Sequence, residues 1–194
     1  MIQESTRGWA WTPLPEIVTV VRRTVQPDQI TGDQIFVGLE HIRSNTGEYA
    51  GPPAVEASIK SNKFAFEPGD ILYGKLRPNL RKCAVSRDYG ICSTDIIPLR
   101  PADPDSAEFI ALQMRSPKFT QKVMRMIGGA NLPRINVNDL MKLELPVPPV
   151  SEEKRLYSGA VLLMEIKNCQ RDLEMSIESL QEAAMQQAFG LGDN

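Results

Sequence analysis

A proline-rich segment followed by a long helical pattern divides this chain into two parts. The run Leu145-Pro-Val-Pro-Pro-Val-Ser-Glu-Glu holds three prolines, which do not fit inside a helix and so fix an extended exit from the preceding part. Ser151 is a suitable N-cap, and Glu152 and Glu153 place negative charge on the first turn, where the helix dipole favours it. We therefore predict a body over residues 1–150 and one rod-like helix over residues 151–190.

Length and composition limit the class of protein. With 194 residues and 42% hydrophobic content, the chain can form one ordinary core. It has no run of about 18 apolar residues, and its first eight residues lack the apolar centre of a signal peptide. The three cysteines, Cys83, Cys92 and Cys169, lie far apart, and a single histidine cannot complete a usual zinc site. We expect a protein of the reducing cytoplasm, with free thiols, no metal and no membrane span.

The body shows many short apolar runs without a regular alternation of strands and helices. Strands are expected over residues 17–21, 34–42, 71–73, 83–86, 90–99 and 142–147, and helices over residues 106–114, 117–127 and 137–141. Ser106 is a candidate cap, and Pro117 opens the second helix. This pattern predicts a mixed, mostly β body of the α+β class with a few helices, followed by the long C-terminal helix as a coiled coil.

The long helix carries an apolar stripe with alternating steps of three and four residues, which is typical of a coiled coil. From Ser151 to Phe189, a span of 39 residues, the helix would be about 57 Å long at 1.5 Å per residue, which is more than a body of this size covers easily. The alternative is that the helix packs on its own body. The length favours a helical partner, from this chain or another. We expect the dimerisation contacts at Leu156, Leu163, Ile166, Gln170, Leu173, Ile177 and Leu180, with Gly159 and Ala184 completing the spacing.

A search for catalytic motifs finds none. The sequence has no nucleophile elbow, no Walker A loop and no Gly-x-Gly-x-x-Gly. An enzyme would have to rest on His41 with Ser93 or Asp95, whereas a structural role of the Ser93-Thr94-Asp95 segment at strand ends is the simpler interpretation. We expect no catalytic residues in this chain.

Charge is segregated along the sequence and points to a polyanion. Residues 1–59 carry a net charge of −3, residues 60–134 of +6 and residues 135–194 of −5. The densest basic segment is Gly74-Lys-Leu-Arg-Pro-Asn-Leu-Arg-Lys, where guanidinium groups suit phosphate or guanine and ammonium groups act as point charges. The alternative is surface decoration of strand ends. The candidate DNA-binding residues are Lys75, Arg77, Arg81, Lys82, Asn131, Arg134 and Arg43.

Four separate motifs, in order, resemble type I restriction–modification specificity subunits. They are Gly8-Trp-Ala-Trp-Thr-Pro-Leu-Pro-Glu-Ile; Phe66-Glu-Pro-Gly-Asp-Ile-Leu-Tyr-Gly-Lys-Leu-Arg-Pro-Asn-Leu-Arg-Lys; Gly90-Ile-Cys-Ser-Thr-Asp; and the Leu145 segment with its helix. Two departures stand out. Glu153-Lys154 replaces the glutamine that the family commonly has at the helix start, and this chain has one recognition domain and one long helix where the family's usual subunit has two of each.

The resemblance implies a half-length, non-catalytic subunit that recognises a bipartite site in double-stranded DNA. It also implies docking to adenine methyltransferase subunits, which carry the S-adenosylmethionine, with nuclease subunits able to join. A single recognition domain predicts a homodimer through antiparallel helices, with Gln170 near the two-fold axis and an inverted-repeat target. Base-reading residues are expected in the loops 42–55 and 128–134. The competing interpretation is a non-DNA adaptor whose C-terminal helix docks a partner protein.

Overall fold

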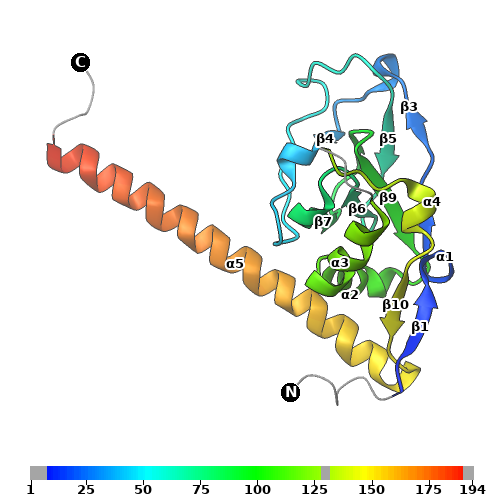
Figure 1. Ribbon diagram of the computed structural model, residues 1–194. Coiled ribbons are helices and arrows are strands. Elements are labelled where there is room, and N and C mark those ends of the chain that lie inside the picture. The colour runs from blue at the N-terminus through cyan, green and yellow to red at the C-terminus, as the bar shows by residue number, and fades with distance from the viewer. Residues whose placement is uncertain (1–7, 128–131, 190–194) are drawn as a thin grey trace.

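One long helix projects from a head of β-sheets and short helices (Figure 1). The computed structural model describes residues 8–127 and 132–189, and side chains as far as residue 186. We use "head" for the described residues up to 149 and "stalk" for the helix α5 (Val150–Phe189). The mixed α+β head and the long C-terminal helix confirm the predicted fold class.

Two four-stranded sheets and a two-stranded ribbon form the head. The first sheet has the order β2 (Val18–Val20), β9 (Ile96–Pro101), β6 (Ile71–Gly74) and β7 (Cys83–Val85), and it is antiparallel. The second has the order β3 (Thr24–Val25), β5 (Lys63–Phe66), β8 (Gly90–Cys92) and β4 (Ile35–Val37), with β4 parallel to β8. The ribbon pairs β1 (Ala10–Pro13) with β10 (Glu144–Val147) and leads directly into the stalk.

The head also contains short helices. They are α1 (Leu14–Ile17), α2 (Ala107–Met114), α3 (Pro117–Met126) and α4 (Val137–Leu140), and 3-10 turns occupy η1 (Pro27–Gln29), η2 (Leu39–His41), η3 (Pro78–Leu80) and η4 (Pro104–Ser106). Of the α-helices, α2 and α3 lie on the side of the stalk (Figure 1). Helix α3 starts at Pro117, as predicted, and the Phe119 N–H donates to Ser116 Oγ at 3.1 Å. Ser106 is not a side-chain cap; its hydroxyl instead donates to the Asp103 carbonyl at 2.6 Å.

Strand β6 lies at the centre of the head and is buried on both faces. Ile71 and Tyr73 belong to the main apolar cluster, which β6 shares with α2, α3 and α4. Leu72 points the other way, into a second cluster with Val37 and Phe66 of the second sheet. This alternation follows from the two-residue repeat of a strand, and it explains why the run 71–73 is continuously apolar.

Two of the predicted strands, over residues 34–42 and 90–99, differ most from the structure, and local turns explain both differences. The run 90–99 is divided between β8 and β9, which belong to different sheets, because the Ile96 N–H donates to the Ser93 carbonyl at 2.9 Å. The run 34–42 ends as a strand at Val37, since the Gly38 N–H donates to His41 Nδ1 at 3.0 Å and closes the turn η2.

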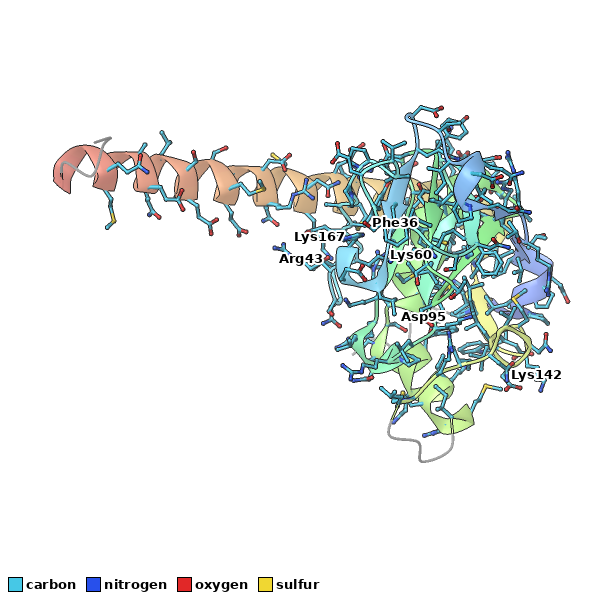
Figure 2. The ribbon with its side chains drawn as sticks, turned by 90° about the horizontal axis from the view of Figure 1, so that it is seen from above. Phe36, Arg43, Lys60, Asp95, Lys142 and Lys167 are labelled. Carbon is cyan, nitrogen blue, oxygen red and sulfur yellow. The ribbon has the colours of Figure 1, made fainter. Side chains whose placement is uncertain are left out.

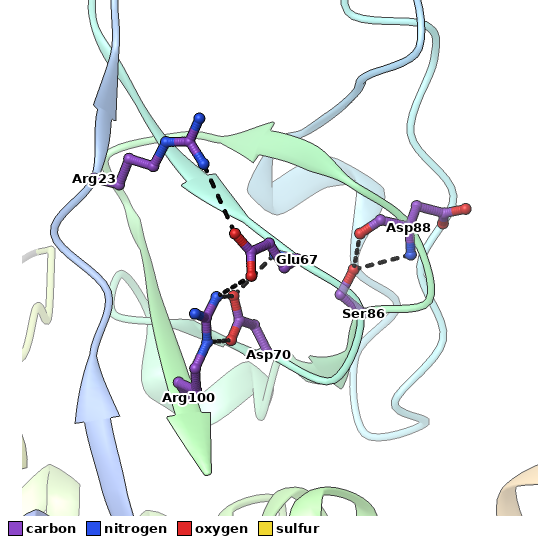
Figure 3. A network of polar contacts seen from close by, with 6 residues as sticks. All are labelled: Arg23, Glu67, Asp70, Ser86, Asp88 and Arg100. Atoms are coloured by element: carbon purple, nitrogen blue, oxygen red, sulfur yellow. Dashed lines mark hydrogen bonds and ion pairs between the residues drawn. The ribbon is translucent and has the colours of Figure 1, made fainter. Parts of the chain in front are cut away.

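A buried carboxylate connects the turn before β6 to strand β9 (Figure 3). Asp70 is 1% exposed, and Arg100 donates to it through Nε at 2.8 Å and through Nη2 at 3.0 Å. The Glu67 N–H donates to the same carboxylate at 2.9 Å, and the Glu67 side chain pairs with Arg100 at 2.9 Å and Arg23 at 3.7 Å. The Glu67-Pro-Gly-Asp motif therefore has a structural role, because its aspartate holds the turn against the neighbouring strand.

We expect Asp70→Asn to lower the free energy of unfolding by about 2 kcal/mol, because hydrogen bonds to a buried charged acceptor are lost. Glu67→Gln is the matched control. Its carboxylate is 40% exposed, so the loss should stay below about 0.5 kcal/mol. Urea denaturation of both variants measures the difference, and equal losses would contradict this assignment.

Candidate nucleic-acid interface and the stalk

The basic loop between β6 and β7 is held in an unusual backbone conformation. Arg77 has φ 51° and Arg81 has φ 52°, on either side of the short turn η3. Left-handed backbone is sterically unfavourable for side-chain-bearing residues and persists where the surroundings impose it. The buried Pro78 anchors the turn between them. The loop is therefore rigidly placed, and it presents Arg77 at the surface.

Arg134 is brought to this loop from a distant part of the sequence. Leu76 forms an isolated antiparallel bridge with Arg134, the Arg77 N–H donates to the Pro133 carbonyl at 2.7 Å, and the Ile135 N–H donates to the Lys75 carbonyl at 3.0 Å. The structure thus brings together four of the predicted DNA-binding residues. We call Lys75, Arg77, Arg81 and Arg134 the basic surface.

The cations of this region differ in whether their charged groups already contact other residues of the head. Lys82 Nζ donates to the Leu39 carbonyl at 2.6 Å, so its ammonium group holds the head together. Arg134 forms an ion pair with Asp95. Burial, followed by the nearby charge of Arg134, lowers the pKa of Lys75 below its ordinary value. Within residues 8–127 and 132–186, Arg77 and Arg81 have no ion pair. These two arginines are the most available to an external anion.

The two remaining predicted DNA-binding residues, Arg43 and Asn131, are not among the residues that define the basic surface. Arg43 lies on a short hairpin, where its side chain pairs with Glu48 at 3.0 Å. It lines a surface pocket together with Lys82 and with Arg171 of the stalk, and Figure 2 shows it beside Lys167, where the stalk leaves the head. Asn131 lies outside the described residues.

The residues considered for catalysis have structural roles. His41 Nδ1 accepts from the Gly38 N–H, and its ring stands edge-on to Phe36 with centroids 5.7 Å apart. Ser93 Oγ accepts from the Asp95 N–H at 3.3 Å and so stabilises the turn between β8 and β9. Among the described residues, no hydrogen bond joins His41 to Ser93 or Asp95, and no cluster of three metal-ligating side chains exists.

The stalk meets the head through an apolar stripe that its sequence spacing alone did not single out. Tyr157, Ala160 and Met164 are 8%, 5% and 3% exposed. Tyr157 packs on Phe109 of α2, with ring centroids 5.3 Å apart, and Trp9 also packs on Phe109, at 5.8 Å. The signal was present in the sequence, since these stalk positions follow steps of three and four residues, but the adjacent stripe from Leu156 has the same spacing.

A buried arginine completes this contact region between head and stalk, which we call the joint. Arg115 is 4% exposed; its Nη1 donates to the Cys83 carbonyl at 2.9 Å and its Nη2 to the Met164 sulfur at 3.5 Å. Gly47, with φ 87°, lies against it, and a Cβ at this position would stand 2.6 Å from Nη1. Arg115 therefore contacts strand β7, the 42–49 hairpin and the stalk, none of which are neighbours in sequence.

The predicted dimerisation stripe lies on a face of the stalk that the head leaves open. Leu163, Ile166, Leu173, Ile177 and Leu180 are between 38% and 70% exposed, and Gln170 is exposed as well. Leu156 is partly covered because it packs against the cluster of Phe109 and Tyr157. All side chains from residue 172 to residue 186 are exposed. The distal stalk therefore makes no substantial contact with its own head, as far as the described residues extend.

Fold and site together define a class: a mixed α+β head with a rigid basic loop, carried on a helical stalk. By sequence, the chain is 28% identical over 150 residues to the type I restriction enzyme EcoDI specificity subunit of Escherichia coli, a match that covers 77% of this chain and 33% of that protein. No protein-family model matches the chain.

Solved structures show the same fold. The HsdS subunit from Thermoanaerobacter tengcongensis superposes with a TM-score of 0.64 at 24% identity, covering 96% of this chain and 51% of that one. The type I S subunit from M. genitalium gives 0.63 at 13% identity, covering 100% and 48%. The resemblance to type I specificity subunits is therefore confirmed. This chain spans about half the length of those structures and a third of the curated relative. None of the described helices is long and apolar enough to cross a membrane.

The joint contains a carboxyl group whose ionisation opposes folding. Burial raises the pKa of Glu108 above its ordinary value of 4.5, and the positive charges of Arg115 and Arg87 offset only part of this effect. A carboxyl whose pKa is higher in the folded than in the unfolded state stabilises the fold below its ordinary pKa, and this contribution is lost as the pH rises through the folded value.

We therefore expect Glu108→Gln to raise the urea midpoint at about pH 7 and to leave it unchanged near pH 4, where the wild-type carboxyl is protonated. Glu182→Gln, at an exposed stalk position, is the control and should change neither midpoint. A loss of stability in Glu108→Gln at pH 7 would show that the ionised carboxylate stabilises the folded state through Arg115 and does not destabilise it.

Proposed function

We propose that this chain is a DNA-recognition subunit of a type I restriction–modification system that acts as a homodimer. Each head contacts one half of a bipartite site in double-stranded DNA, and two stalks pair antiparallel to set the distance between the heads. The chain itself is non-catalytic in this proposal. Adenine methyltransferase subunits, with S-adenosylmethionine as their methyl donor, dock on it, and nuclease subunits can join.

The observation that carries the proposal is the exposed apolar stripe on the distal stalk. Exposed apolar side chains at coiled-coil spacing over residues 163–180 have no partner within the described part of their own chain. Pairing with a second stalk buries them, and a symmetric pair places two identical heads at opposite ends of a rigid spacer. An inverted-repeat target follows from that symmetry.

The basic surface supports the DNA-binding part of the proposal. Arg77 and Arg81 stand on a rigid loop, and Arg134 lies across from it. Guanidinium groups bind phosphate through paired hydrogen bonds, and phosphate contacts position a protein on the duplex without selecting the sequence. In this proposal the loop of Arg77 and Arg81 contacts the phosphate backbone of DNA, while the less patterned loops 42–55 and 128–134 remain the candidates for reading bases.

The DNA-binding role is tested by the salt dependence of affinity. We expect Arg77→Gln/Arg81→Gln to reduce the slope of log K against log salt by about 2, since each phosphate contact contributes about 0.9. Arg22→Gln/Arg155→Gln removes the same charge from positions outside the basic surface and should leave the slope nearly unchanged. Fluorescence anisotropy on a duplex carrying the selected target measures both. An unaltered slope in the first variant would remove these arginines from the interface, and a wild-type chain that binds no DNA even with methyltransferase subunits would favour the adaptor alternative.

Dimerisation is tested by one matched pair of stalk variants. Leu173 and Met175 are both 61% exposed, but only Leu173 lies on the predicted stripe. Leu173→Gln removes one leucine from each of two paired helices, so the dimer should weaken by about 3 kcal/mol, roughly 100-fold in Kd. Met175→Gln should change it by less than about threefold. Sedimentation equilibrium gives both constants; a monomeric wild-type chain, or equal effects of the two variants, would refute stalk pairing.

A further inference from the structure

The first turns of the stalk and the adjacent edge of the head line a groove beside the head contact, and Tyr157 borders both. Its volume is about 800 Å³. One wall is the stalk from Val150 to Glu165, and the opposite wall consists of η4 and the start of α2. Glu108 lines this groove and also a second, smaller pocket.

Helical spacing assigns the groove its own face of the stalk. The dimer stripe starts at Leu156, the stripe buried on the head starts at Tyr157, and the groove stripe starts at Ser158 and continues through Val161 and Glu165. Successive residues of a helix are about 100° apart, so these three stripes face three different directions. An occupant of the groove would therefore compete neither with the head nor with a second stalk.

The groove combines apolar surface with an excess of negative charge. Val150, Val161 and Leu162 are 82%, 40% and 56% exposed. The carboxylates around them are Asp103, Asp105, Glu108, Glu153 and Glu165, and Lys154 is the only cation among the described residues of the lining. None of these five carboxylates has an ion pair within residues 8–127 and 132–186. The charges of Glu153 and Asp103 also raise the pKa of Tyr157, in addition to the larger effect of its burial.

Charge excludes two of the possible occupants. Phosphate is repelled by five carboxylates, so the groove does not bind nucleic acid. A second copy of the stalk is also unsuitable at this site, because residues 151–186 carry seven carboxylates against four cations and would meet the five carboxylates of the groove lining. The complementary occupant is a segment with an apolar stripe and basic flanks. A helix is about 10–12 Å across with its side chains, and helix-in-groove recognition uses anchors at this spacing.

We propose that this groove docks a basic amphipathic helix of a partner protein. The inference rests on the proposed function only in taking that partner to be a subunit of the same restriction–modification system. The helix lays its apolar stripe on Val161 and Leu162, and its lysines or arginines meet Asp105 and Glu165 at the two walls. Because these carboxylates are exposed, the attraction is screened by salt and affinity falls as ionic strength rises.

The test uses the full chain and a defined probe. The probe is a synthetic peptide of about 18 residues, roughly five helical turns, with leucines at steps of three and four and lysines elsewhere; a peptide with glutamates in place of the lysines is its control. Ser158→Cys, labelled with an environment-sensitive fluorophore, reports occupancy of the groove. The label is placed in a Cys169→Ser background, since Cys169 is the exposed cysteine and Cys83 and Cys92 are buried.

We expect saturable binding of the basic peptide at low salt and no binding of the acidic one. Asp105→Lys/Glu165→Lys should weaken the basic peptide at least tenfold. The matched control, Glu178→Lys/Glu182→Lys, makes the same charge change at exposed positions of the distal stalk and should weaken it less than threefold.

Three outcomes would overturn the inference: no binding of the basic peptide, equal binding to the two reversed-charge variants, or a change in the mass of the peptide-free chain in Asp105→Lys/Glu165→Lys, which would identify a second copy as the occupant. DNA affinity and dimer mass are measured on the same variants. If they match the wild type while peptide binding fails, only the groove assignment falls and the proposed function stands.

Discussion

The packing of Tyr157, Ala160 and Met164 on the head determines the direction of the whole stalk. A continuous helix is stiff over this length, so these three side chains and their partners on α2 and β7 set where every later residue lies (Figure 1). The contact of Tyr157 with Phe109 buries apolar surface between head and stalk. Arg115 instead orients the stalk, because it donates hydrogen bonds both to the Cys83 carbonyl in the head and to the Met164 sulfur in the stalk. Burying a guanidinium group costs desolvation free energy, so its net contribution to stability is small. Its position here is better explained by the geometry that it imposes between head and stalk.

Local signals in the sequence were sufficient for the elements that are fixed locally. The start of α3 at Pro117 was predicted because a helix start depends on a few consecutive residues. The break between β8 and β9 was missed, since both halves are apolar and only their membership of different sheets separates them. The cap at Asp103 rather than Ser106 was missed for a similar reason: both residue types cap helices, and the difference lies in which oxygen reaches an N–H.

The same limit applies to the site: composition indicates which segment is basic, but only the contacts determine which side chains are available to a ligand. Charge density marked the loop correctly as basic, but it could not distinguish Lys82, which is bound to a backbone carbonyl, from Arg77, which is exposed. Nor could it show that Arg134 lies across from the loop through a bridge to Leu76. In the stalk, the spacing from Leu156 was recognised, while the identical spacing from Tyr157 was not. Periodicity identifies apolar stripes, and only the position of the head determines which stripe it covers.

The charge segregation of the sequence has a spatial counterpart in the fold. The positive middle segment supplies the basic surface, and the negative C-terminal segment supplies the stalk. The acidic groove combines both segments, since Asp103, Asp105 and Glu108 come from the middle segment and Glu153 and Glu165 from the stalk. A polyanion is therefore attracted to the loop of Arg77 and repelled from the groove face. A basic protein segment experiences the opposite preference. Under the two proposals, one charge distribution thus directs two different partners to different surfaces of the same chain, since the groove lining includes no residue of the basic surface.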